Sequence, residues 1–182
     1  MKKVSTFLPE DFETVEALAV IDILRRAGVT VDLISISDGL DVVSAQKIAV
    51  KAEYTLSGYD FSDTDMIFLP GGPGIKNYEK NEALLSIVKE FHNKSKLVAA
   101  ICAAPSILGH LGILEGKKAT CFPGYEKDLY GAKVVKEKVV TDGNITTAIG
   151  MGASMEMGLE MVRILVDEKM KDKIAKTTQF II

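Results

Sequence analysis

Short apolar runs alternate along this chain with longer segments in which apolar residues recur every three or four positions. The apolar runs predict strands at residues 3–8, 29–36, 66–72 and 96–101. The helical spacing predicts helices at residues 13–28, 81–95 and 153–166, and a further helix beginning near residue 105. This alternation is typical of repeated β-α-β units, so we expect an α/β fold with a mostly parallel sheet covered by helices on both faces.

Two segments interrupt the alternation. Residues 38–60 contain shorter pieces without helical spacing, and we expect a small antiparallel excursion there. Residues 117–148 behave similarly, with Asp142 and Gly143 marking a turn between strands. A charged stretch follows the last predicted helix. Because linkers, low-complexity segments and repeats are not found, we expect one domain over residues 1–182.

Composition narrows the classes of partner and compartment. The chain has a net charge of −3 and lacks a basic cluster, which argues against binding to nucleic acid or to an anionic membrane. The first residues lack a signal-peptide core, and no apolar run approaches the roughly 20 residues of a membrane span. We therefore expect a cytoplasmic protein with reduced thiols. Its two cysteines and two histidines are isolated from one another in sequence, so a structural zinc site is not expected.

A cysteine stands where a predicted strand meets a predicted helix, in "KLVAAICAAPSILG" at residues 96–109. Cys102 takes the last strand position or the first turn residue, and Pro105 falls in the first helical turn. This arrangement is typical of a nucleophile elbow, and the helix N-terminus should lower the thiol pKa below ~8.5. The alternative is a small apolar residue buried at a core junction.

The glycine-rich stretch "LPGGPG", residues 69–74, ends another predicted strand. Glycines allow backbone N–H groups to approach a ligand closely. The N–H groups of Gly72 and Ala103 would together form an oxyanion-binding site. An ordinary glycine-rich loop is the alternative interpretation.

The first predicted helix contributes a carboxyl group. At about 100° per residue, Asp22, Arg25 and Arg26 share one side of this helix. Glu13 and Glu16 fall on the opposite, apolar side, where burial raises the pKa of a carboxyl group. We favour Glu16 as a protonated partner for the thiol, because Glu13 is in the first turn. A structural role in capping the backbone is the alternative for Glu16.

The stretches "AAICAAP", "LPGG" and "ETVEALAVIDILRRAG" resemble the ThiJ/PfpI superfamily, and within it the branch of Parkinson disease protein seven and the protein deglycases. The resemblance covers nearly the whole chain. It implies a flavodoxin-like, three-layer α/β/α sandwich of the class I glutamine amidotransferase type, usually a homodimer. It also implies that Cys102 is the nucleophile, Glu16 its protonated partner, and Gly72 and Ala103 the N–H donors.

Two departures from the family pattern concern histidine. The peptidase branch has a histidine directly after the cysteine, where this chain has Ala103, and the deglycase branch commonly has one at the position of Phe122. A Cys-His protease is therefore not expected. Gln46 and Ile149 also stand where relatives carry arginine, so we expect a small and comparatively apolar pocket.

Three hypotheses follow for function. In the first, an enzyme of glyoxalase or deglycase type uses Cys102 to attack small α-oxoaldehydes or their protein adducts, without a metal or organic cofactor. In the second, Cys102 is an oxidative-stress sensor that forms a sulfinate, or the protein is a chaperone. In the third, the fold is a binding module and the cysteine is inert. For Cys121, a disulfide with Cys102 under oxidation and a buried strand cysteine remain alternatives.

Overall fold

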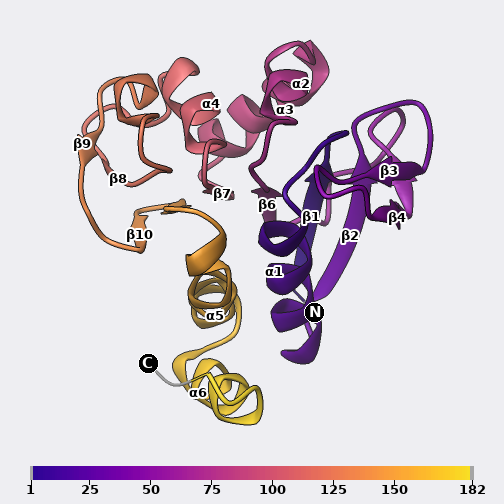
Figure 1. Cartoon of the computed structure of the whole chain (residues 1–182). Helices are drawn as coiled ribbons and strands as arrows, with labels where there is room; N and C mark the ends of the chain where they lie inside the picture. Colours follow the sequence, from indigo (N-terminus) through magenta and orange to yellow (C-terminus); the bar gives the residue numbers. More distant parts are fainter. Residues whose placement is uncertain (1, 181–182) are drawn as a thin grey trace.

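A seven-stranded sheet runs through the middle of the molecule, whose computed structural model describes residues 2–180 (Figure 1). The strand order is β10-β11-β7-β6-β1-β2-β5, and the pairs are parallel except for the antiparallel pair β10 and β11. The strands are β1 (Lys3–Leu8), β2 (Thr30–Ser35), β5 (Tyr54–Thr55), β6 (Met66–Leu69), β7 (Leu97–Ile101), β10 (Val139–Asp142) and β11 (Ile145–Ala148). The predicted mostly parallel sheet is confirmed.

Helices cover both faces of this sheet (Figure 1). One apolar cluster joins α1, α5 and α6 to the sheet through side chains such as Leu24, Val162 and Ile174. A second cluster joins α2, α3 and α4 to the opposite face through Tyr78 and Val88, among others. The helices are α1 (Thr14–Arg26), α2 (Ile75–Glu79), α3 (Glu82–Asn93), α4 (Pro105–His110), α5 (Ser154–Leu165) and α6 (Glu168–Thr177), with 3-10 turns at η1 (Glu126–Asp128) and η2 (Met151–Ala153).

Burial explains why the central strands are continuous apolar runs. All four residues of β6 are buried, as are the last four of β7, because both faces of a parallel sheet carry helices. Along β1, Val4 and Leu8 pack in the first cluster while Phe7 packs in the second. The side chains therefore alternate between two helical layers, which gives the expected α/β/α arrangement.

The two irregular segments are confirmed in part. β3 (Asp41–Val43) and β4 (Ala49–Lys51) form the expected antiparallel pair, but β5 leaves it and pairs in parallel with β2 in the main sheet. In the second segment, β10 and β11 are antiparallel around the predicted turn, whereas β8 (Lys118–Ala119) and β9 (Lys133–Val134) pair in parallel. The antiparallel expectation was wrong there, since pairs of two residues leave little periodicity in the sequence.

The charged stretch after α5 is a helix, which the sequence analysis missed. The Asp167 carboxylate caps α6 by accepting a hydrogen bond from the backbone N–H of Met170. Ile174 and Ala175 are its buried residues, so the apolar face is too narrow to give a clear helical pattern. Across residues 2–180, none of the helices has the length and hydropathy required to cross a membrane.

The strand order reverses between β1 and β6, and the carboxyl ends of β1, β6, β7 and β11 lie along one edge of the sheet. Open α/β sheets bind ligands at such a reversal. Gly71 and Gly72 follow β6, Cys102 follows β7 and Gly150 follows β11. These residues therefore meet at the edge where a site is expected.

Candidate active site

The backbone of Cys102 forms a strained turn between β7 and α4. Its φ is 65°, a left-handed conformation that costs a non-glycine residue roughly 1–3 kcal/mol. The turn is secured on both sides: the Cys102 N–H donates to the carbonyl of Ala148 at 2.9 Å, and the Cys102 carbonyl accepts from the N–H of Phe122 at 2.8 Å. Pro105 begins α4. The structure thus contains the sharp strand-to-helix turn that the sequence predicts.

Glu16 lies on the inner face of α1 and is only 1% exposed. Its Oε2 atom accepts a hydrogen bond from the Gly71 N–H at 3.0 Å, and its carboxyl group is hydrogen-bonded to the Cys102 thiol. Glu13 is the N-cap of α1, with its carboxylate accepting from the Glu16 N–H at 2.8 Å. The burial expected for Glu16 is confirmed, and Glu13 takes the capping role.

Burial dominates the electrostatics of the two reactive groups. It raises the pKa of Glu16 to about 7, against the hydrogen bonds from Cys102 and Gly71 that lower it. Burial, followed by the charge of Glu16, raises the pKa of Cys102 to about 12. The expectation that the thiol pKa falls below its ordinary value was therefore wrong. The N–H groups of Ala103 and Gly72 do lower it, but burial and the nearby carboxylate act more strongly.

The two groups titrate as a pair, because each one's charge acts on the other. The pKa of Glu16 is about 7 and that of Cys102 about 12, so the carboxyl group gives up its proton first and the thiol keeps its own at neutral pH. A thiolate therefore requires the Glu16 carboxylate to accept the thiol proton, along the hydrogen bond that joins the two groups.

Two consecutive glycines let the loop after β6 pack against this pair. A Cβ atom at Gly71 would lie 2.6 Å from the Cβ of Cys102 and 2.7 Å from Oε2 of Glu16. Gly72 has a φ of 96°, and a Cβ there would lie 2.5 Å from the backbone nitrogen of Glu13. The N–H groups of Gly72 and Ala103 both face the Cys102 sulfur. The expected donors are thus placed together, and Gly71 is a site residue that the sequence analysis missed despite the double glycine.

An aromatic side chain lies close to the reactive pair. A Cβ atom at Gly150 would lie 3.2 Å from Cδ2 of Phe122 and 3.7 Å from both Sγ of Cys102 and Oε1 of Glu16. Phe122 and Met151 are 47% and 54% exposed, respectively. Gln46 is tied to α1, where its Oε1 accepts from the Thr14 hydroxyl at 2.6 Å. A phenyl ring therefore stands close to the reactive pair, at the position where the resemblance led us to look for a histidine.

The two histidines and the second cysteine have other surroundings. His110 lies between Glu79 and Asp128, at 3.6 and 3.5 Å, and burial lowers the pKa of His92 on α3. The groups that shift the Cys102 pKa include neither histidine.

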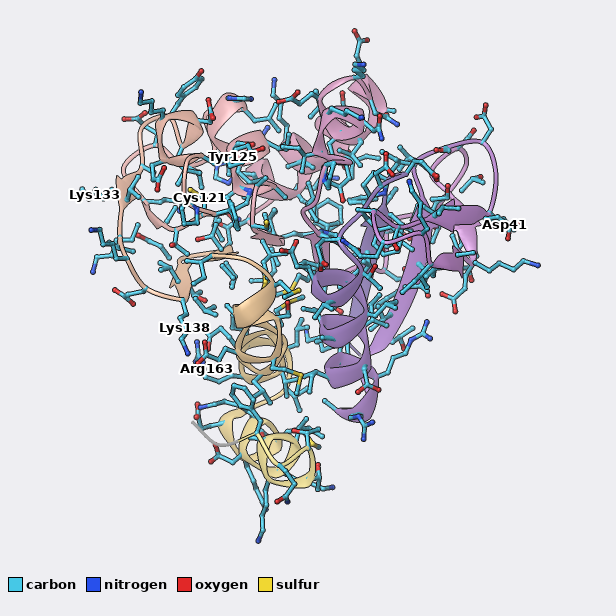
Figure 2. All side chains as sticks on the ribbon, in the orientation of Figure 1. Asp41, Cys121, Tyr125, Lys133, Lys138 and Arg163 are labelled. Atoms are coloured by element: carbon cyan, nitrogen blue, oxygen red, sulfur yellow. The ribbon has the colours of Figure 1, made fainter. Side chains whose placement is uncertain are left out.

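Cys121 is 5% exposed and free, within the packed side chains near Tyr125 (Figure 2). It follows β8, and burial raises its pKa to about 11. Within residues 2–180, no group of three or more acidic, histidine or cysteine side chains is arranged to bind a metal.

Comparison with known proteins places these features in a family. The model of the DJ-1/PfpI family matches residues 2–164. Protein DJ-1 homolog B of Arabidopsis thaliana is 33% identical over 91% of this chain, which spans only 38% of that protein's length. Deglycase PH1704 of Pyrococcus horikoshii is 33% identical over 78% of this chain and 86% of the deglycase's own length. The solved structure of oxidized Toxoplasma gondii DJ-1 superimposes with a TM-score of 0.95, at 30% identity, over 100% of both chains.

Proposed function

The chain belongs to the DJ-1/PfpI family, and from this premise we propose that it is a cysteine-dependent enzyme acting on small α-oxoaldehydes or their protein adducts. The observation that carries the proposal is the contact between the Cys102 thiol and the buried Glu16 carboxyl, faced by two backbone N–H groups. A nucleophile, a proton carrier and oxyanion donors are the groups that addition to a carbonyl requires. The name deglycase, which belongs to the Pyrococcus relative, agrees with a carbonyl adduct as substrate.

The first proposed step is addition of sulfur to the aldehyde. The Glu16 carboxylate accepts the thiol proton, the Sγ atom of Cys102 bonds to the aldehyde carbon, and the carbonyl oxygen becomes an oxyanion. The N–H groups of Gly72 and Ala103 would donate to this oxyanion. Glu16 then protonates the oxygen and is left as a carboxylate, which can act as a base because its pKa of about 7 lies near neutral pH.

The later steps move two protons and add one water. The Glu16 carboxylate removes the proton from the former aldehyde carbon and returns it to the neighbouring carbon. The hydroxyl proton on the former aldehyde oxygen passes to the neighbouring oxygen, and the adduct becomes a thioester of a 2-hydroxy acid. Water hydrolyses the thioester, releases the hydroxy acid and restores the thiol. The oxoaldehyde and one water together equal the hydroxy acid, so the sequence needs no oxidant or reductant.

The rim of the site favours a small or apolar substrate. Phe122 presents apolar surface close to the reactive pair, and Gln46 carries a neutral amide that is hydrogen-bonded to Thr14. Methylglyoxal fits this chemistry better than a phosphorylated aldehyde, which would leave an anionic group without a cationic partner.

The proposal is tested by incubating the protein with methylglyoxal and measuring lactate as well as loss of aldehyde. The wild type should form lactate repeatedly, and Cys102→Ser should form none above the buffer rate. A lactate rate that is the same in both proteins would refute the proposal. Loss of aldehyde alone does not count, because any thiol adds to aldehydes reversibly.

A second candidate function is oxidative sensing at the same sulfur. Cys102 is partly exposed, and a protonated Glu16 and two N–H groups would stabilise a sulfinate. The Toxoplasma structure is described as oxidized. Mass spectrometry after mild peroxide treatment tests this candidate. Selective gain of two oxygens on Cys102 supports it, and Cys102 oxidation no faster than that of the methionines argues against it.

A further inference from the structure

The hydroxyl group of Tyr78, on the short helix α2, lies between two backbone carbonyls beneath the candidate site. The side chain is 0% exposed. Its single O–H donor is shared between the carbonyls of Phe7 and Pro70, each 3.1 Å from the hydroxyl oxygen. The first carbonyl belongs to the end of β1 and the second to the loop after β6. Tyr78 therefore joins the two strand ends at which the sheet order reverses.

The Pro70 carbonyl and the Gly71 N–H belong to the same peptide group. A peptide group is planar, and in the trans form its C=O and N–H bonds point in opposite directions. The Tyr78 hydroxyl binds one end of this plane, and the other end donates to Oε2 of Glu16 at 3.0 Å. Fixing the carbonyl therefore fixes the direction of the N–H bond toward Glu16.

We infer that Tyr78 is a positioning residue for the reactive pair, acting on Glu16 through the peptide group between Pro70 and Gly71. The inference rests on the proposed function only in taking Cys102 and Glu16 as the reacting groups. The order of contacts is the phenol, the peptide plane, the carboxyl group and the thiol. Hydrogen bonds linked in this way polarise one another, so the phenol strengthens the bond that Glu16 receives.

A purely space-filling role does not account for the hydroxyl group. Phenylalanine would fill nearly the same volume in the apolar cluster around Tyr78 without burying a polar atom. Burial, and then the charge of Glu16, raises the pKa of Tyr78 well above its ordinary value. The phenol therefore stays protonated at physiological pH and remains a donor to the peptide group.

Tyr78→Phe tests the inference, with Tyr59→Phe as the matched control. Tyr59 also has a hydrogen-bonded hydroxyl, which donates to Asp32 near the amino end of the sheet, away from the candidate site. The measurement is the rate of Cys102 alkylation by iodoacetamide against pH, read by mass spectrometry of the Cys102 peptide. Loss of the phenol weakens the Gly71 bond that favours the Glu16 carboxylate. The midpoint of the first ionisation should therefore move to higher pH by roughly half a unit.

The control variant should keep the wild-type midpoint. If Tyr78→Phe and wild type share one midpoint, or if Tyr59→Phe moves it equally, the inference is wrong and Tyr78 is a core residue only. Should Tyr78→Phe fail to fold, replacing Tyr78 by 3-fluorotyrosine keeps the hydroxyl and makes it a stronger donor. The midpoint must then move in the opposite direction, to lower pH, and an unmoved midpoint again overturns the inference.

Alkylation does not depend on any aldehyde substrate, so the two proposals fail separately. A shifted midpoint without lactate formation by the wild type would retain the role of Tyr78 and reject the enzyme. Lactate formation with an unmoved midpoint would retain the enzyme and reject the role of Tyr78.

Discussion

The substitution Glu16→Gln should make the protein more stable at neutral and alkaline pH than the wild type. Burial raises the pKa of Glu16 from 4.5 to about 7. The folded state therefore binds a proton that the unfolded state has released between these two values. The resulting stabilisation is complete below about pH 4.5 and is lost as the pH rises through about 7. At ~1.4 kcal/mol for each pH unit, the loss amounts to about 3 kcal/mol.

Glutamine does not suffer this loss, because it has no proton to release. Its amide oxygen can still accept from the Gly71 N–H, the bond that Oε2 of Glu16 accepts at 3.0 Å, so the packing of the site is retained. The assay is urea unfolding followed by circular dichroism, since the chain contains 0 tryptophans. It should be run in reducing buffer at about pH 5 and about pH 8. From the lower to the higher pH, the difference in unfolding free energy between Glu16→Gln and wild type should rise by roughly 2–3 kcal/mol in favour of the variant.

Only the difference between the two proteins matters, because every other titrating group is common to both. The Cys102 thiol contributes little below about pH 8, since its ordinary pKa of 9.0 and its raised value both lie above that range. A difference in unfolding free energy that stays constant from acid to alkaline pH would refute the reasoning. Glu16 would then ionise as an exposed carboxyl group does, and its pKa would not be raised by burial.

Three further substitutions probe the surroundings of the pair. Gly71→Ala should lower the free energy of unfolding by about 1–3 kcal/mol, because its Cβ would lie 2.6 Å from that of Cys102, and an unchanged stability would contradict the packing argument. Gly152→Ala is the control: its Cβ would meet open space, so this variant should unfold at the same urea concentration as wild type. Phe122→His places an imidazole beside the sulfur. The rate of lactate formation should then rise roughly 10-fold or more and show a new pH dependence near ~6.5, and an unchanged rate and pH profile would contradict this. Cys121→Ser should change the Cys102 alkylation rate less than ~2-fold, whereas a large loss would indicate that the two thiols act together.

The sequence predicts the central fold well, because the buried strands and amphipathic helices have clear periodicities. The strand at β7 and the turn at Cys102 follow directly from an apolar run, a cysteine and Pro105. The helix α6 escapes prediction because its buried face is reduced to Ile174 and Ala175. Parallel pairing of β8 with β9 depends on contacts between distant segments, which local periodicity does not contain.

The positions of Glu16 and Cys102 in the fold were predictable, but their electrostatics were not. Helical spacing correctly places Glu16 on the buried side of α1. The direction of the Cys102 pKa could not be obtained from the position of a helix alone, because burial and the neighbouring carboxylate outweigh the N–H groups. Tyr78 left no signal at all, since a tyrosine in a five-residue helix has the pattern of an ordinary core residue.

The left-handed backbone at Cys102 has a consequence for how this protein can change over generations. Glycine would adopt a φ of 65° without steric penalty, so the cysteine keeps the folded state less stable than it could be. A lineage that had abandoned sulfur chemistry would gain stability by drifting to glycine at residue 102. The residue at position 102 should therefore distinguish homologues that still use cysteine chemistry from homologues that have lost it.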